Sequence, residues 1–426
     1  MAGASLWLYR ALVAGLLPLA IPVLKVRDRL AAKRRPPFAE RLARDLPELA
    51  GGGLWLHAVS VGEVEIARRL VRELDERAPG LPLLVSATTA TGLDLARRTL
   101  GERLPVIASP LDLPGPVGRV LDRARPRAVA TVETELWPEM LHQAARRGIP
   151  AAVVNGRLSD ASYRRYRRVR PVLKPLLEPL RLVLARSDAD AERFAGLGIP
   201  VSAIRVAGNV KYDLEPDPRP LPWADALEAA AGERPVVVAG STMEGEEGAV
   251  LDAVAGLAAA GRRPLLVLAP RHPERFDAVA ALVGDRGLEL VRRSSDQAPG
   301  PTTEVFLLDT IGELARAYRL ASAAFIGGSL VPTGGHNPLE PAVWGVPVLS
   351  GPHVHNFAEV YEEMAAAGGA RLVTDGAGLG EALARWLADP GTARAAGAAG
   401  LAVVEANRGA TAVTAAALLE LVGEPS

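Results

Sequence analysis

The fold is decided by Gly334-Gly335-His336-Asn337-Pro338-Leu339-Glu340-Pro341 and by Trp344-Gly345-Val346-Pro347-Val348-Leu349, which follows it. This pattern is typical of a loop that opens a short helix and then leads into a buried strand. Asn337 suits the N-cap of that helix, and Pro338 suits its first position. The free N–H groups at a helix N-terminus attract phosphate, and glycines let a ligand approach the backbone closely. A capped helix with a glycine turn is the plain interpretation, but the glycine pair and Glu340 in the first turn favour a nucleotide-sugar site.

Apolar runs bounded by turn residues recur through the chain, and helical patterns such as residues 63–73 lie between most of them. Strands that alternate with helices predict a parallel sheet covered on both faces. The strands expected in the first half are residues 54–59, 81–86, 104–108, 128–132, 151–154, 182–185 and 201–206. Those expected in the second half are residues 235–239, 265–269, 288–291, 305–308, 323–326, 346–349 and 372–373.

The two series of strands predict two doubly wound, Rossmann-like α/β domains that face each other across a cleft. Ligands in such folds bind outside the carboxyl ends of the strands. A segment rich in proline and acidic residues separates the two series and is typical of a linker. The expected organisation is a membrane-anchoring helix with a basic flank at 1–35, an N-terminal acceptor-binding domain at 36–212, a linker at 213–234, a C-terminal nucleotide-sugar-binding domain at 235–400, and a C-terminal helix at 401–426.

The overall composition excludes several classes of function. Lys plus Arg and Asp plus Glu both number 49 in the 426 residues, so the net charge is zero and gives no support to a nucleic-acid partner. The chain has no cysteine, which removes disulfides and thiolate metal sites from consideration. Its six histidines leave little room for a metal centre with several histidine ligands. No metal and no cofactor are expected.

The N-terminus departs from this balanced composition, because residues 6–9 and 11–24 are almost entirely apolar. A basic cluster follows at once, formed by Lys25, Arg27, Arg29, Lys33, Arg34 and Arg35. Basic residues after an apolar run predict a membrane anchor, with the chain that follows the anchor on the cytoplasmic side. A cleaved signal peptide instead has its basic residues before the apolar run. Arg10, Pro18 and Pro22 weaken a full span, so a helix lying in the membrane interface stays open beside a single pass. A buried helix is the plain alternative.

Three patterns resemble functional motifs but favour other interpretations. Asp188-Ala189-Asp190 directly precedes a helical run and is read as charge bias at a helix N-terminus, not as a metal site. The loop 240–245 lacks both the glycine order of dinucleotide folds and the Walker lysine, so NAD and ATP are not favoured. The run 163–170 interleaves tyrosines with arginines. Contact with lipid headgroups or an anionic acceptor is its first interpretation, a solvated helix the second and nucleic acid the last.

A set of short motifs occurs in one order along nearly the whole chain, and the chain resembles the 3-deoxy-D-manno-octulosonic acid (Kdo) transferases of lipopolysaccharide synthesis. This family has the glycosyltransferase B (GT-B) architecture. Each motif alone is weak, but the ordered set is specific. The motifs are His57-Ala58-Val59-Ser60-Val61-Gly62-Glu63, Glu133-Thr134-Glu135-Leu136-Trp137-Pro138, Asn155-Gly156-Arg157-Leu158-Ser159, Gly208-Asn209-Val210-Lys211-Tyr212-Asp213, Ala239-Gly240-Ser241-Thr242, Pro270-Arg271-His272, Gly312-Glu313-Leu314 and the Gly-Gly-His-Asn-Pro-Leu-Glu block.

The resemblance implies an inverting transfer of Kdo from CMP-Kdo to a lipid A precursor, lipid IVA. It places the reaction at the cytoplasmic face of the inner membrane, with membrane lipid as a further partner and without a required metal. Another GT-B nucleotide-sugar transferase or epimerase is the enzymatic alternative. A membrane-attached protein that binds a sugar nucleotide without turnover is the non-enzymatic one.

Three residues are candidates for catalysis. Glu63 follows the first expected strand, where a carboxylate can project toward the cleft and act as the base an inverting transfer needs; complementing the helix dipole is an equal alternative. The resemblance decides for Glu63 as general base. Glu133 and Lys211 also follow strands, and the resemblance implies that they support the transition state or orient the base. A surface ion pair is the plain alternative for them.

The nucleotide pocket is expected in the second domain. Arg271 and His272 directly follow the expected strand 265–269, and arginine can grip a phosphate through two parallel hydrogen bonds. The resemblance implies that Glu340 accepts hydrogen bonds from ribose hydroxyls and that backbone groups around Gly312 read the base. It implies a CMP pocket formed by Arg271, His272, Gly312, Glu313, Leu314, Asn337, Pro338, Leu339 and Glu340.

Overall fold

The computed structural model of the protein describes residues 5–7, 9–11, 13, 15, 38–295 and 297–423. Most of the apolar run and all of the basic cluster that predict a membrane anchor lie outside these described residues. The described residues between 5 and 15 are helical. Within the described ranges, no helix has both the length and the apolar character needed to cross a membrane.

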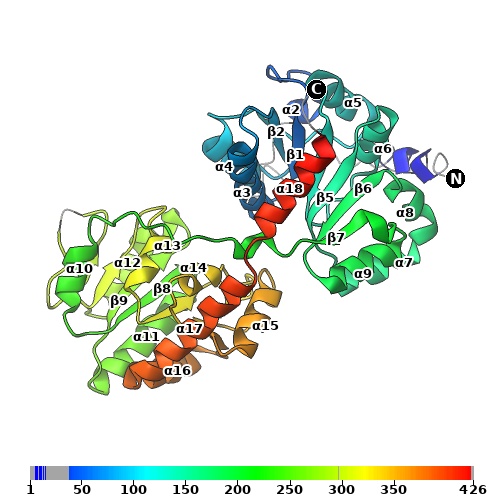
Figure 1. The fold of residues 1–426 in the computed structure, drawn as a ribbon. Coiled ribbons are helices and arrows are strands. Elements are labelled where there is room, and N and C mark those ends of the chain that lie inside the picture. Colours follow the sequence, from blue (N-terminus) through cyan, green and yellow to red (C-terminus); the bar gives the residue numbers. More distant parts are fainter. Residues whose placement is uncertain are drawn as a thin grey trace. The chain divides into compact units, whose positions relative to one another are not determined.

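The chain divides into two compact units, which Figure 1 shows as two groups of helices and strands. Unit 1 comprises Met1–Asp213 and Arg408–Ser426, and unit 2 comprises Leu214–Asn407. Unit 2 is therefore one continuous segment, whereas unit 1 is completed by the C-terminal end of the chain. The domain limits expected from the sequence remain a prediction.

Unit 1 is built on a parallel sheet of seven strands in the order β3-β2-β1-β4-β5-β6-β7. Leu54 lies opposite both Leu83 and Ala128, so the strand order reverses between β1 and β4. Apolar, mostly buried strands are expected in a sheet covered on both faces. The strands are β1 (Leu54–Ala58), β2 (Leu83–Ala87), β3 (Val106–Ala108), β4 (Ala128–Val132), β5 (Ala151–Gly156), β6 (Leu180–Ala185) and β7 (Ile204–Val206).

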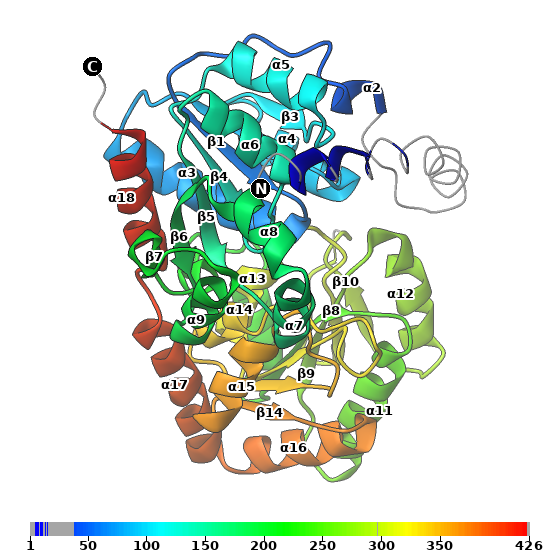
Figure 2. The same cartoon turned by 90° about the vertical axis from the view of Figure 1, so that its right-hand side faces the viewer.

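Helices surround this sheet, and one of them comes from the far end of the sequence. The helix α18 contacts α3, and Figure 2 shows the two side by side. The Asp213 carboxylate accepts hydrogen bonds from the N–H groups of Gly409 and Thr411, so it caps α18. The helices of unit 1 are α2 (Phe38–Arg41), α3 (Val61–Arg77), α4 (Ala90–Leu100), α5 (Pro114–Ala124), α6 (Pro138–Arg146), α7 (Asp160–Arg168), α8 (Arg170–Leu177), α9 (Asp188–Leu197), α18 (Ala410–Val422), and the short 3-10 helices η1 (Val201–Ala203) and η2 (Val210–Tyr212).

Unit 2 repeats this plan with a second parallel seven-stranded sheet in the order β10-β11-β9-β8-β12-β13-β14. Its strand order reverses between β8 and β12. The strands are β8 (Val236–Thr242), β9 (Leu265–Pro270), β10 (Leu290–Arg292), β11 (Val305–Leu307), β12 (Ala323–Ile326), β13 (Val348–Ser350) and β14 (Ala370–Leu372). The prediction of two parallel α/β sheets with seven strands each is confirmed.

The helices of unit 2 begin inside the proline-rich segment. Trp223 is buried, its ring lies 4.9 Å from that of Phe306, and its Nε1–H donates to Glu313 at 3.0 Å. These contacts attach the segment around α10 to unit 2. The helices are α10 (Ala224–Ala231), α11 (Glu246–Ala259), α12 (Phe276–Gly284), α13 (Leu314–Ala317), α14 (Leu339–Ala342), α15 (Ala358–Ala366), α16 (Gly376–Ala388), α17 (Pro390–Ala406), and the 3-10 helices η3 (Pro273–Arg275) and η4 (Tyr318–Leu320).

Candidate active site

Glu63 lies in the first turn of α3, beyond the carboxyl end of β1 and beside the point where the strand order of unit 1 reverses. Its Oε2 accepts a hydrogen bond from the N–H of Val59 at 2.8 Å, and its Oε1 lies 3.0 Å from the hydroxyl of Ser60, the N-cap residue. This is a form of the capping box, so the carboxylate helps to begin the helix. The same two contacts hold it in one orientation.

The environment of Glu63 makes its carboxyl a base of unusual strength. Only 7% of the residue is exposed. Burial, with a smaller contribution from the nearby charges of Glu135 and Glu133, raises the pKa of Glu63 to about 8, although the hydrogen bonds from Val59 and Ser60 act in the opposite direction. A carboxyl group with a pKa near the working pH can accept a proton and release it again, as a general base must.

Glu133 and Lys211 form an ion pair next to this carboxyl. The Lys211 Nζ lies 3.2 Å from the Glu133 Oε1. Glu133 directly follows β4 with a φ of 60°, a left-handed conformation that turns its side chain off the line of the strand. The Asn155 Oδ1 accepts from the N–H of Val210 at 2.9 Å and thereby fixes η2, which carries Lys211. Unit 1 thus brings its predicted catalytic residues to one edge of the sheet.

His57 and Trp137 lie in the same motifs as these residues, but the sequence assigned them no role. His57 is fully buried, its Nδ1 lies 2.8 Å from the Ser86 hydroxyl, and its ring meets that of Trp137 edge to face at 5.2 Å. Burial and the charge of Arg41 lower the pKa of His57 to about 3, so the ring is neutral. A neutral histidine in this position packs the site and does not exchange protons near neutral pH.

A polar hollow of about 450 Å³ opens beside Glu133. The loops after β4 and β5 and the first turns of α7 form its walls. The Thr134 hydroxyl donates to the carbonyl oxygen of Arg157, which ties the two loops together. The lining residues are Glu133, Thr134, Glu135, Leu136, Arg157, Ser159, Ser162 and Tyr166.

In unit 2, a carboxylate that sequence reasoning missed organises the glycine-rich loop after β12. Glu246 is fully buried at the first position of α11. Its Oε2 accepts from the N–H groups of Met243 at 2.8 Å and Gly328 at 2.6 Å, and its Oε1 from those of Ser329 and Leu330, both at 2.8 Å. Three of these donors belong to the loop after β12, which has no regular secondary structure of its own, and the fourth belongs to the loop between β8 and α11, so one carboxylate joins the two loops. No local sequence pattern signals such a contact.

The glycines of this loop are needed for its close packing. Gly328 and Gly334 both have positive φ, at 69° and 102°. A Cβ atom on Gly328 would lie 2.9 Å from the His336 ring, and one on Gly334 would lie 2.4 Å from the Asn356 side chain. The N–H of Gly335 donates to the Gly328 carbonyl at 2.7 Å, which folds the segment back on itself. The glycines therefore shape the loop, in agreement with the close backbone approach expected there.

The short helix in the opening motif exists, but two details of its prediction are wrong. Pro338 is the N-cap residue and Leu339 is the first helical residue, one position later than expected. The Asn337 Oδ1 still accepts from the Leu339 N–H at 3.1 Å, because an Asn side chain can bond two residues ahead. The helix has only four residues, so its dipole is smaller than that of a full helix. Leu339 is fully buried in the core, whereas Glu340 is half-buried.

The other residues expected in the nucleotide pocket follow β9 and β11. Burial, together with the nearby charges of Arg271 and His272, lowers the pKa of His336 in the glycine-rich loop to about 4. Gly312 has a φ of 91° and precedes α13, which begins at Leu314. The Glu313 carboxylate is occupied by Trp223, Thr310 and Arg293.

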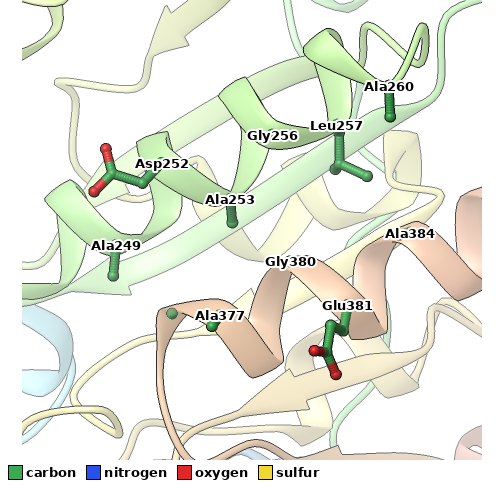
Figure 3. A pocket seen from close by; sticks show the side chains of 11 residues that line it. Ala249, Asp252, Ala253, Gly256, Leu257, Ala260, Ala377, Gly380, Glu381 and Ala384 are labelled. Atoms are coloured by element: carbon green, nitrogen blue, oxygen red, sulfur yellow. The ribbon is translucent and has the colours of Figure 1, made fainter.

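A second hollow, of about 570 Å³, lies between α11 and α16 and contains none of the predicted residues. Figure 3 shows small side chains such as Ala249 and Ala253 on the α11 wall and Ala377 on the α16 wall. Small residues let two helices approach closely, and a Cβ atom on Gly380 would make ordinary contact with Ala253 at 3.6 Å. This hollow lies in the helix layer, away from the carboxyl ends of the strands, and we assign no chemistry to it.

The protein is therefore a two-domain α/β protein, in which each doubly wound unit carries polar groups where its strand order reverses. The fold is shared with the UDP-GlcNAc 2-epimerase of Neisseria meningitidis, whose structure was solved with UDP-GlcNAc bound. That likeness has a TM-score of 0.55 at 13% identity and covers 86% of this chain and 100% of the other, so it bears on the fold alone.

Relatives of higher identity define the family. The family model of 3-deoxy-D-manno-octulosonic-acid transferase (kdotransferase) matches residues 27–214. The 3-deoxy-D-manno-octulosonic acid transferase of Haemophilus influenzae is 34% identical, over 95% of this chain and 96% of that one. The transferase of the same name from Bordetella pertussis is 36% identical, over 97% of this chain and 99% of that one. The chain therefore belongs to the 3-deoxy-D-manno-octulosonic acid transferase family and is a glycosyltransferase.

Proposed function

We propose that the protein transfers Kdo from CMP-Kdo to a hydroxyl group of a lipid A precursor, in lipopolysaccharide synthesis. The observation that carries this proposal is the buried Glu63 carboxylate, held by Val59 and Ser60 at the carboxyl edge of the unit 1 sheet in a chain of this family. The relatives bear the name of the transferase, and the geometry supplies a base for the reaction.

In the proposed reaction the unprotonated Glu63 takes the proton of the acceptor hydroxyl while the oxygen attacks the anomeric carbon of Kdo. The bond between that carbon and the phosphate oxygen of CMP breaks on the opposite face, and CMP leaves with the electron pair. The configuration at the anomeric carbon is inverted. Lys211 partly balances the negative charge of Glu133 and the charge that develops during transfer. Arg271 holds the CMP phosphate from unit 2.

The reaction needs a donor and an acceptor, and we propose that unit 2 binds the donor and unit 1 binds the acceptor. Glu340, Asn337 and the backbone near Gly312 would contact the nucleotide from unit 2. Glu63, Glu133 and Lys211 would meet the acceptor from unit 1.

We also propose that the N-terminal segment attaches the protein to the cytoplasmic face of the inner membrane. The apolar run and the basic cluster after it support this position. Trp7 is 70% exposed, as suits an interfacial side chain, while Leu6 is buried against the protein. Arg10 is bound to Glu139 and does not need to enter the bilayer.

The test is to incubate the purified protein with CMP-Kdo and a tetra-acylated lipid A precursor and to record the mass of the glycolipid. A product heavier by one or more Kdo residues, together with release of CMP, is expected. An unchanged glycolipid beside intact donor would contradict the proposal. A thermal-shift comparison in which UDP stabilises the protein and CMP does not would favour a different nucleotide-sugar enzyme.

A further inference from the structure

We propose that the polar hollow beside Glu133 binds the sugar end of the lipid acceptor. This inference rests on the proposed function and assigns the acceptor site that the reaction requires. The hollow of about 450 Å³ belongs wholly to unit 1 and falls within the size range of small-molecule sites. The occupant to which we commit is a ring rich in hydroxyl groups.

The lining of the hollow has the chemistry that a sugar ring needs. The Glu133 and Glu135 carboxylates can accept hydrogen bonds from hydroxyl groups, and the guanidinium of Arg157 can donate to ring and hydroxyl oxygens. Ser159 and Ser162 can both donate and accept. Two carboxylates in a small volume repel a phosphate, so an anionic group is not the ligand of the hollow itself.

The hollow also lies where an acceptor hydroxyl has to be. Glu133, on its wall, pairs with Lys211 at 3.2 Å. Glu63 follows β1 and Glu133 follows β4, and these strands are hydrogen-bonded neighbours, so the two carboxyl groups lie at the same edge of the sheet, where their charges interact. A sugar in the hollow would therefore present a hydroxyl group to the proposed base.

The surface next to the hollow suits the rest of the acceptor. The helix α7 carries Ser162 and Tyr166 toward the hollow, and its arginines Arg164, Arg165, Arg167 and Arg168 are exposed. Val169 and Val172, the next apolar residues along the chain, are 50% and 40% exposed. Phosphates of the acceptor would meet the arginines, and its acyl chains would lie toward the valines and the membrane.

The walls of the hollow are fixed before any ligand binds. The Ser159 hydroxyl accepts from the Ser162 N–H at 3.2 Å and caps α7. The buried Asp190 carboxylate accepts from the Leu158 N–H at 2.8 Å, which anchors the loop after β5. A preformed site loses less conformational entropy when it binds.

The test is to fill the hollow with Ser162→Phe and to compare it with Ala161→Phe, a matched change at the exposed neighbouring position on α7. Ser162→Phe is expected to raise the KM for the lipid acceptor by about tenfold or more, a loss of about 1.4 kcal/mol in binding, and to leave the KM for CMP-Kdo unchanged. Ala161→Phe should change neither. An unaltered acceptor KM in Ser162→Phe would overturn the proposal.

A second variant guards against a folding defect in Ser162→Phe. Glu135→Gln keeps the shape of the wall and removes one charge, and it should weaken binding of the deacylated, water-soluble acceptor as measured by calorimetry. Equal affinity of Glu135→Gln and the wild type for this probe would also contradict the site. If the wild type itself transfers no sugar, the proposed function fails; if it transfers sugar and both variants bind acceptor normally, only the site fails.

Discussion

At Glu63 a structural role and a chemical role fall on the same side chain. The carboxylate closes a capping box with Ser60, which alone would account for its presence at this position. A cap needs no burial, however, and ordinary caps are solvated. Burial, and after it the nearby charges of Glu135 and Glu133, work against ionisation, so the carboxyl group of Glu63 binds a proton readily. The residue pattern alone left these two roles equal, and the family resemblance favoured the base; the buried environment of the carboxylate supports the same assignment.

The raised pKa predicts how the rate depends on pH. The base acts only when it is ionised, so kcat/KM should rise with pH up to about 8, the pKa of Glu63. Glu63→Gln should remove both the activity and this limb of the profile. Glu65→Gln, on the same helix but paired with Arg68 at the surface, is the control and should leave the profile as it is. A wild-type profile that is flat between pH 6 and pH 9, chosen as roughly two units below and one above this pKa, would contradict the assignment.

The free energy of unfolding should also depend on the protonation of Glu63, but it should fall with rising pH where kcat/KM rises. The pKa of Glu63 is about 8 in the folded protein and 4.5 as its ordinary value, so the folded state binds the proton more tightly. The stabilisation by this group is complete below pH 4.5 and is lost as the pH rises toward 8. Chemical denaturation at several pH values should show that Glu63→Gln flattens this fall. A fall of equal size in the variant would assign the effect to other groups.

Substitutions at the two ends of the Glu133–Lys211 ion pair should shift the pKa of Glu63 in opposite directions. Lys211→Met leaves the Glu133 charge less compensated, which should move the pKa in the rate profile upward. Glu133→Gln removes a charge that opposes ionisation of Glu63 and should move the pKa downward. Both variants should lower kcat by about tenfold or more if the pair supports the transition state. Shifts in the same direction would refute this coupling.

Among the elements, the glycine-rich loop of unit 2 depends on the start of α11. Glu246→Gln keeps one acceptor oxygen but turns an NH₂ group toward backbone donors, leaving two of the four N–H groups unbonded. Each unsatisfied buried donor costs about 1 to 3 kcal/mol, so two of them should lower the free energy of unfolding by about 2 to 6 kcal/mol. Urea denaturation measures this, and the exposed Glu244→Gln is the matched control.

Glu246→Gln should also change the KM for the sugar donor more than the KM for the lipid acceptor. If the loop carries the nucleotide, the Glu246→Gln variant should show a higher KM for CMP-Kdo and an unchanged KM for the lipid. A change confined to the acceptor KM would place the nucleotide elsewhere.

The helical residues near the N-terminus are joined to α6, the element that follows the Glu133–Trp137 loop. The Arg10 guanidinium bonds both oxygens of the fully buried Glu139 carboxylate at 2.7 and 2.8 Å. The Tyr9 hydroxyl donates to Asp112 at 2.6 Å, and Asp112 accepts from the N–H groups of Glu139 and Met140 at the start of α6. Arg10, which weakened the case for a full membrane span, thus has a partner in the protein.

Breaking this junction should therefore destabilise unit 1. Arg10→Met leaves the Glu139 charge buried with less compensation, and we expect a loss of about 2 kcal/mol, below the range for fully buried pairs because Arg10 is partly exposed. Arg146→Met, on the exposed face of α6, should change the unfolding free energy by less than about 0.5 kcal/mol. Thermal unfolding of both variants in detergent checks the difference. Equal stability of the two variants would show that the contact contributes nothing.

In the whole molecule, the chain leaves unit 1 at Asp213 and returns to it at Arg408, so unit 1 needs the end of the sequence. Leu418 and Val422 of α18 belong to the core around β1 and α3. Removing residues 408–426 should abolish the cooperative calorimetric unfolding of unit 1 and leave that of unit 2. Leu418→Ala should cost about 2 to 5 kcal/mol, and the half-exposed Val413→Ala under about 1. Independent folding of unit 1 without α18 would contradict this view.

The sequence indicated the place of all fourteen strands of the two sheets because most of them are apolar runs bounded by turn residues. The bounds were least accurate at the short strands β7, β10 and β14, each of which contains an arginine. Local patterns also brought Glu63, Glu133 and Lys211 into consideration, since all three follow strands. Patterns of this kind cannot show Glu246 bound to the N–H groups of residues 328–330, because that contact joins segments about eighty residues apart and follows no spacing rule. The register of the short helix was missed by one residue, because Asn337 bonds ahead across a proline.

The central claim is that the Glu63 carboxyl is the base in sugar transfer, and single-turnover transfer by Glu63→Gln, beside CMP binding by the same variant, tests it most directly. We predict that CMP binds with the wild-type affinity while Kdo transfer from CMP-Kdo to the lipid A precursor falls by about a hundredfold or more. Transfer at a rate near that of the wild type would contradict the claim.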